Sequence, residues 1–132
     1  MWRTVASILA GLVVWTIVAT ILNFGLRAAL PGYHAAESTL QFTIAMKVGR
    51  LSLAALASLA AGASVRAVVP TSRAAPWVAG AIVLALFLPV HYQLWDKFPA
   101  WYHLTFLLSI VPLFGLGAAL GSRAGKTEAM QR

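Results

Sequence analysis

Four long apolar segments dominate this chain, and each is close to the length that a helix needs to cross a lipid bilayer. A membrane-crossing helix requires about 20 mostly apolar residues. The first segment has no charged residue between positions 5 and 22, and Pro31-Gly32 stop it shortly after Arg27. Prolines at positions 70, 76 and 99 mark the ends or starts of the other three. The pattern predicts helices over about residues 5–29, 43–69, 76–95 and 100–121, followed by a tail over 122–132.

Composition excludes a soluble domain. The chain has 132 residues, of which 61% are hydrophobic and only 10% are charged. A soluble protein of this size has a large surface relative to its volume and needs polar residues to cover it. We therefore expect an all-α, polytopic membrane protein, with residues 1–132 forming one transmembrane domain. The short connections near Pro70 and Pro99 predict that successive helices run antiparallel. The four helices then form a bundle of two hairpins, with the connection near Pro70 between the hairpins.

A weak internal repeat is one interpretation of the two hairpins. Shifting the chain along itself pairs Ala10-Gly11 with Ala79-Gly80 and Tyr33-His34 with Tyr102-His103. A shorter shift pairs Arg66 with Arg123. Parallel repeats occur in transporters, but helices rich in Ala and Leu also align by chance. Duplication and chance alignment both stay open.

The net charge of +7 is interpreted through membrane topology. A basic soluble protein would point to nucleic acid, but here the basic residues flank apolar segments, where they meet anionic lipid headgroups. We therefore expect membrane lipids as partners and no nucleic acid. With both termini in the cytoplasm of a bacterial-type inner membrane, six basic residues lie inside and at most four outside, as the positive-inside rule requires. The inner set is Arg3, Arg66, Arg73, Arg123, Lys126 and Arg132, and the outer set is Arg27, Lys47, Arg50 and Lys97.

Several classes of chemistry lack the residues that they need. The chain has no cysteine, which excludes disulfides and thiolate-bound metals. No acidic residue falls within the central membrane, where a proton-coupled pump usually carries one. No nucleophile motif or phosphate-binding loop is present either. We predict no catalytic residue, no metal site and no resident cofactor.

Polar residues inside the first apolar segment point to a site. Thr16, Thr20, Asn23 and Arg27 follow one another at intervals of three or four residues, which places them on one helix face. Threonine hydroxyls often bond to their own helix backbone and indicate little by themselves. Asn23 is more costly in lipid and should face another helix.

The second apolar segment supplies a matching basic face. Lys47 and Arg50 are one turn apart, and the same face continues through small residues at positions 54, 58 and 62. Small residues at this spacing let helices approach closely. If this face packs inward, Lys47 and Arg50 form a basic cluster with Arg27. The alternative is that both side chains extend to the headgroups, as long cationic stems readily do.

The last two helices carry His91 and His103 at similar depths, about 7–9 Å from their connecting turn. Two histidines on adjacent helices could hold a metal or a haem iron. The simpler interpretation is hydrogen bonding to carbonyls or to a nearby carboxylate, because two histidines without further ligands are weak evidence for a metal site.

These features predict a polar pocket on the outer side that binds or passes a small anionic ligand or a lipid headgroup. Three alternatives remain: an assembly partner of a larger membrane complex or of a second copy, a bis-histidine haem subunit for electron transfer, and, least favoured, an enzyme acting on lipid. The expected ligand-binding residues are Asn23, Arg27, Lys47, Arg50, His91 and His103.

Overall fold

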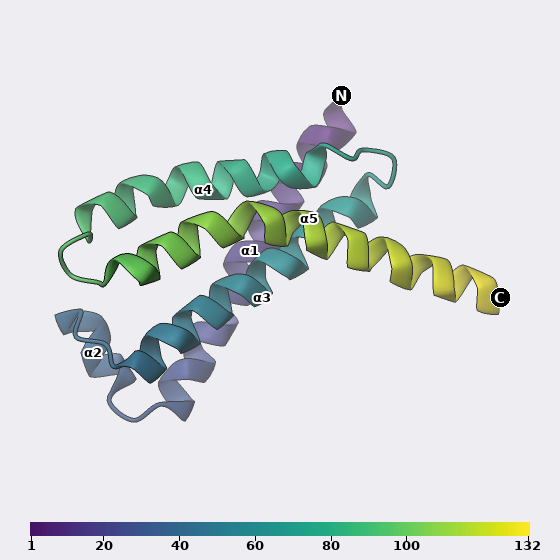
Figure 1. Ribbon diagram of the computed structural model, residues 1–132. Coiled ribbons are helices and arrows are strands. Elements are labelled where there is room, and N and C mark those ends of the chain that lie inside the picture. Colours follow the sequence, from purple (N-terminus) through teal and green to yellow (C-terminus); the bar gives the residue numbers. More distant parts are fainter.

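The computed structural model describes residues 1–132 and is entirely helical. Five helices follow one another along the chain: α1 (Trp2–Ala29), α2 (Tyr33–Thr39), α3 (Ile44–Val68), α4 (Ala75–Gln93) and α5 (Ala100–Gln131). All but α2 are long and apolar enough to cross a membrane. Helices α1 and α3 form one antiparallel hairpin, and α4 and α5 form the other (Figure 1). The expectation of a multi-pass, four-helix membrane bundle is confirmed.

The connections divide the bundle into two ends. Helix α2 and the turn between α4 and α5 lie at one end, which we call the α2 end (Figure 1). The two chain termini and the α3–α4 connection belong to the other, the termini end. Helix α2 forms within the first connection, which is the longest of the three. It begins after Gly32, whose φ of 79° favours glycine, and the residue that caps its C-terminus, Leu40, also has a positive φ of 58°.

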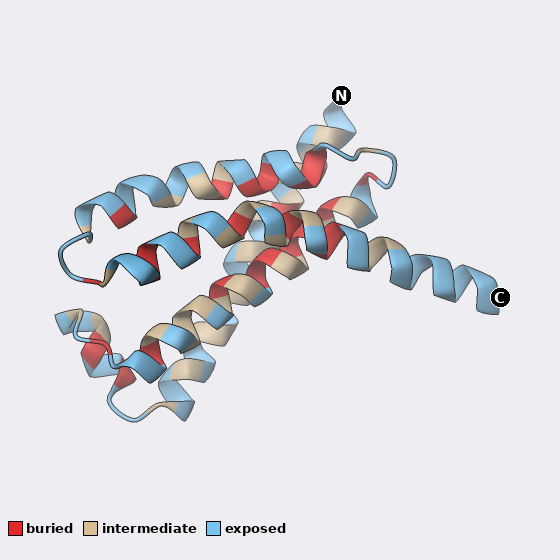
Figure 2. Cartoon of the chain, viewed as in Figure 1, coloured by how far each residue is buried: buried red, intermediate tan, exposed pale blue.

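One expected boundary is wrong. The last helix does not end near position 121, since α5 continues to Gln131 and residues 122–131 of the expected tail are helical. The expectation equated the end of apolar character with the end of the helix. Residues 122–131 contain no proline, and Ala, Lys, Glu, Met and Gln all favour helix. This part of α5 extends away from the bundle and is exposed beyond Ser122 (Figure 2).

The centre of the bundle is a close crossing of α3 and α5. A Cβ atom added to Gly62 would meet the backbone of Phe114, and one added to Gly117 would meet the backbone of Leu59. The contact is reciprocal, because each helix places a glycine against a residue that precedes the partner glycine by three positions. Small residues at such crossings let backbones touch, which is how helices associate where lipid removes the hydrophobic driving force.

Helices α1 and α4 pack onto this crossing in the half of the bundle nearest the termini. Gly11 of α1 meets Val65 of α3 and lies near Ala79 of α4. The buried residues of α1 are only Ser7 and Gly11, so α1 is anchored at that depth and its outer faces remain exposed. Figure 2 shows buried residues along the facing sides of α3, α4 and α5 and pale, exposed surface elsewhere. In a membrane this exposed apolar surface contacts lipid.

Candidate functional site

A cavity of about 450 Å³ lies between the two hairpins, toward the α2 end. Its size is within the range of small-molecule sites, roughly 300–1,000 Å³. We call it the polar cleft. Its polar and charged lining comes from four helices: Thr16, Thr20, Asn23 and Arg27 of α1, Glu37 of α2, Arg50 of α3 and Tyr102 of α5. Several of the α1 residues are exposed, so the cleft is open to the surroundings of the bundle.

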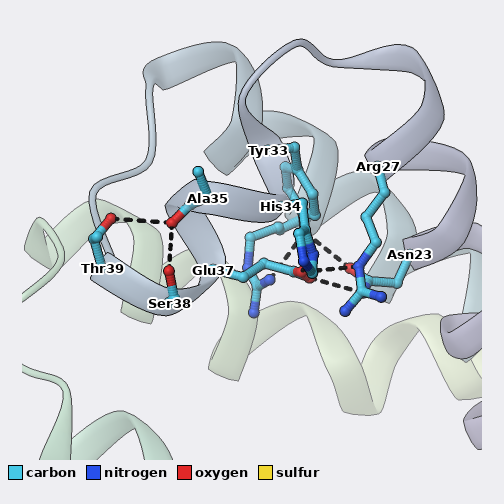
Figure 3. A network of polar contacts seen from close by, with 9 residues as sticks. Asn23, Arg27, Tyr33, His34, Ala35, Glu37, Ser38 and Thr39 are labelled. Carbon is cyan, nitrogen blue, oxygen red and sulfur yellow. Dashed lines mark hydrogen bonds and ion pairs between the residues drawn. The ribbon is translucent and has the colours of Figure 1, made fainter.

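Glu37 lies at the centre of one half of the polar network. Asn23 Nδ2 donates to its Oε1 at 2.9 Å, and Arg27 Nε donates to its Oε2 at 2.8 Å. His34 Nδ1 lies 3.5 Å from the same Oε2. Figure 3 shows these side chains converging on the carboxylate from α1 and α2. The short helix α2 therefore folds back onto the end of α1 and brings Glu37 to the cleft. Glu37 is the only acidic residue that lines the cleft.

Arg50 forms the other half of the network. Its Nη1 donates to the Tyr33 hydroxyl at 2.9 Å, and its Nε donates to the Tyr102 hydroxyl at 3.2 Å. The guanidinium also lies over the ring of Phe42, 4.8 Å from its centroid. Tyr33 in turn donates to Asn23 Oδ1 at 2.9 Å, which joins the two halves. One continuous network thus links α1, α2, α3 and α5.

The electrostatic state of the two α2 residues follows from their partners. Burial works to raise the pKa of the Glu37 carboxyl, but hydrogen bonds from Asn23 and Arg27 outweigh it and hold that pKa below the ordinary value of 4.5. Burial raises the pKa of the Tyr33 hydroxyl above 10.0, although Arg50 opposes the shift. At neutral pH Glu37 is therefore ionised, and Tyr33 keeps the proton that it donates to Asn23.

The cleft carries one positive charge that no protein group neutralises. Arg27 pairs with Glu37, whereas Arg50 has only two phenol oxygens and no carboxylate. The Nη2 atom of Arg50 has no hydrogen-bond partner in the protein, and neither do the two Nη atoms of Arg27. These nitrogens are free to donate to a bound group. The cleft thus presents guanidinium donors and a net charge of one positive unit.

The inner end of the cleft is less polar. Trp15 Nε1 donates to Ser58 Oγ at 3.0 Å, and this hydroxyl donates to the Ala54 carbonyl at 2.7 Å. Phe87 packs against Trp15, and Phe106 packs against Phe87. The hydroxyls of Thr16 and Thr20 donate to carbonyls of their own helix. The free donors of the cleft are therefore the arginines near the α2 end and the Tyr102 hydroxyl, which accepts from Arg50 and donates to no protein group.

Three of the six predicted ligand-binding residues come together in the cleft: Asn23, Arg27 and Arg50. Lys47 is half-buried one turn from Arg50, does not line the cleft, and makes no side-chain hydrogen bond or ion pair. His91 and His103 do not line the cleft either. They lie behind Tyr102 and Phe106, whose rings pack against His91.

The two histidines contact each other. His91 Nδ1 and His103 Nδ1 are 2.7 Å apart, which is a hydrogen bond, so one ring donates and the other accepts. Trp95 stacks on His103, with ring centroids 4.7 Å apart. The Nε2 atom of His103 is buried without a partner. The expected hydrogen bonding of these histidines thus runs between the rings rather than to Asp96 or a carbonyl.

The facing Nδ1 atoms leave no room for a haem iron between them. Two nitrogens on opposite sides of one metal ion lie about 4 Å apart, twice a metal–nitrogen bond of ~2 Å. The facing Nδ1 atoms are much closer than that and point at each other. No group of three or more metal-ligating side chains occurs elsewhere in the structure.

Sequence reasoning missed three residues of the network: Tyr33, Glu37 and Tyr102. Glu37 falls in the connection between the first two predicted helices, and nothing in its neighbours indicates that α2 folds back onto α1. The tyrosines did leave a signal. Tyr33-His34 aligns with Tyr102-His103 when the chain is shifted along itself, and both tyrosine hydroxyls meet the Arg50 guanidinium.

Comparisons of the chain with protein-family models, with curated proteins and with solved structures found no significant match.

Proposed function

We propose that this protein binds a small anionic ligand or an anionic lipid headgroup in the polar cleft. The observation that carries the proposal is Arg50, a partly buried guanidinium within a membrane helix that has hydrogen-bond acceptors but no counter-charge. A charge held away from water is costly unless an opposite charge accompanies it. An anion with two or more oxygens would accept from the free nitrogens of Arg50 and Arg27 and would neutralise the cleft.

The surrounding groups support an anion rather than a cation. Glu37 is the only carboxylate of the cleft, and Asn23 and Arg27 already occupy both of its oxygens. A cation would meet a carboxylate whose charge Arg27 already neutralises. An anion meets donors that have no other partner, and guanidinium groups bind phosphate and carboxylate oxygens in a fixed, often bidentate geometry.

We further propose that the protein lies in a bacterial-type inner membrane with both termini in the cytoplasm. The excess of Lys and Arg at the termini end supports this orientation. The polar cleft then opens at the outer leaflet. An anion or headgroup would reach Arg50 from that side.

The test compares Arg50→Gln with Lys47→Gln in the purified, full-length protein. Both changes remove one positive charge from α3, one turn apart, but only Arg50 lines the cleft. Phosphatidylglycerol and inorganic phosphate are titrated in a neutral detergent, and bound molecules are counted by native mass spectrometry. We expect Arg50→Gln to weaken binding at least tenfold and Lys47→Gln to change it less than threefold; tenfold corresponds to about 1.4 kcal/mol.

Equal loss in both variants would show that binding follows overall charge, and it would contradict the proposal. Unchanged binding in Arg50→Gln would contradict it as well. Circular dichroism of each variant establishes that the helices are intact. Arg27→Gln provides a second variant of the cleft if Arg50→Gln does not fold.

An assembly role is the second candidate, and one observation favours it. The end of α5 beyond Ser122 is exposed and extends from the bundle. The small-residue faces that could have docked a partner are already used, because Gly62 and Gly117 lie in the crossing of α3 and α5. A stoichiometric partner that co-purifies in mild detergent and is lost on deletion of 123–132 would favour this role. Purification as a lone monomer would contradict it.

A further inference from the structure

A second, apolar cavity adjoins the polar cleft. It has a volume of about 380 Å³ and lies between α1 and α4. We call it the α1–α4 groove. Its lining is Leu12, Trp15, Thr16, Val83, Leu86, Phe87 and Val90, and three of these residues, Trp15, Thr16 and Phe87, also line the polar cleft. The two cavities therefore share these three side chains as walls.

The groove has no side-chain donor that is free to bind water. Thr16 is its one hydroxyl, and that hydroxyl already donates to the Leu12 carbonyl at 3.0 Å. The Trp15 indole nitrogen donates to Ser58. A cavity holds water only where polar partners are available. Because Thr16, Leu86 and Val90 are exposed, the groove is also open to the side of the bundle, where lipid lies.

The combined length of groove and cleft matches one leaflet. From Leu12, at the inner end of the groove, to Asn23, in the cleft, α1 rises about 16 Å at 1.5 Å per residue. Half of the hydrocarbon core of a bilayer is about 15 Å thick. Along α1, the distance from the inner end of the groove to the cleft is thus about the thickness of one leaflet.

From this arrangement we infer that the occupant is a whole phospholipid with one negative charge, its phosphate between Arg50 and Arg27 and one acyl chain in the α1–α4 groove. The inference rests on the proposed function and names the ligand of that site. A phosphodiester carries one negative charge and neutralises the single uncompensated charge of the cleft. A free anion would fill the cleft and leave the groove empty.

Packing gives the acyl chain a physical role. Lipid tails are as apolar as the groove, so the tail gains little from the hydrophobic effect inside a membrane. An unfilled apolar cavity, however, deprives its lining of dispersion contacts. A chain that fills the groove restores these contacts and holds the phosphate at the depth of Arg50. The charge selects the headgroup, and the groove selects a ligand with a tail.

The experiment fills the groove with a side chain. Val90 lines the groove but not the cleft, so Val90→Trp blocks the acyl chain and leaves the arginines in place. Leu88→Trp is the matched control, because Leu88 is two residues away on the opposite face of α4 and is similarly exposed. Native mass spectrometry in neutral detergent measures binding of dioleoyl and dihexanoyl phosphatidylglycerol and of inorganic phosphate to each full-length variant.

We expect the intact protein and Leu88→Trp to prefer the long-chain lipid over the short-chain lipid. In Val90→Trp this preference should fall roughly tenfold, while phosphate binding is unchanged. If Val90→Trp and Leu88→Trp retain the same chain-length preference, the inference is wrong. It is also wrong if phosphate alone competes as well as the long-chain lipid, although the anion site of the proposed function would then stand. Arg50→Gln should lose all three ligands, whereas the two tryptophan variants should still bind phosphate. This difference distinguishes the anion site from the groove.

Discussion

The carboxylate of Glu37 has a partner of opposite charge, whereas the guanidinium of Arg50 has none. Each Glu37 oxygen has a donor, Asn23 at Oε1 and Arg27 at Oε2, and Arg27 neutralises its charge. Arg50 keeps a free nitrogen and has no counter-charge. An unpaired charge in a membrane-spanning helix is energetically unfavourable, and such residues usually mark a functional site. The candidate site therefore depends on Arg50, and Glu37 holds the neighbouring arginine and α2 in place.

The lowered pKa of Glu37 predicts how α2 responds to pH. A carboxylate whose pKa is lower in the folded state stabilises the structure above its ordinary pKa, and this contribution is lost as the pH falls through the folded-state value. The contact between α2 and α1 should hold at pH 5 and weaken only below pH 4.5. Hydrogen exchange of the α2 amides, measured against pH, should show this step.

Glu37→Gln is the control for that measurement, because an amide does not titrate in this range. The variant should show faster exchange in α2 at neutral pH and no step on acidification. A step in the unmodified protein centred above pH 4.5 would contradict the assignment of Glu37 as the partner of Arg27.

At the level of the helices, the crossing of α3 and α5 positions the site. Gly62 and Gly117 bring the two backbones together, and the same two helices carry Arg50 and Tyr102. A fixed crossing therefore fixes the distance between the guanidinium and the phenol. Small residues on helices α1 and α4 add the inner contacts, while their outer halves border the groove.

Gly117→Ala tests the crossing. The added methyl would meet the backbone of Leu59, which cannot move aside as a flexible side chain could. Overpacking of this kind typically costs about 1–3 kcal/mol. We expect a lower unfolding temperature in detergent, together with weaker phosphatidylglycerol binding as Tyr102 shifts from Arg50.

Gly125→Ala is the control on the same helix, where an added Cβ meets nothing within 4 Å. It should raise stability slightly, because alanine favours an exposed helix by up to about 1 kcal/mol over glycine. Equal behaviour of the two variants would show that α3 and α5 do not cross at Gly117.

At the level of the whole molecule, an even number of crossings places both termini on one side and α2 on the other. The chain lacks cysteine, so single introduced cysteines can be labelled without background. With cytoplasmic termini, Ser38→Cys in α2 should react with a membrane-impermeant maleimide in intact spheroplasts, and Ala129→Cys should react only after lysis. Reaction of Ala129→Cys in intact spheroplasts would reverse the proposed orientation, and the cleft would then face the inner leaflet.

The sequence by itself determined the four membrane helices, their two hairpins and the polar face of α1. These follow from local properties: the length of apolar segments, the positions of proline and the 3.6-residue period that aligns Asn23 and Arg27. The end of α5 was misjudged because loss of apolar character was taken for loss of helix, although nothing after Gly121 breaks one.

The tertiary structure decided which polar residues meet. Helix α2 folds back and brings Glu37 to Arg27, and the α3–α5 crossing brings Tyr102 to Arg50 across 52 positions of the chain. Periodicity states which face a side chain occupies, but not which helix covers that face. Lys47 and Arg50 lie on the same face of α3 and each carries one positive charge, yet only Arg50 lines the cleft. The reason is that α5 and the first connection place Tyr102 and Tyr33 against Arg50. The α1–α4 groove has the same origin, since it exists only where two helices that touch near the termini end stay apart beyond it.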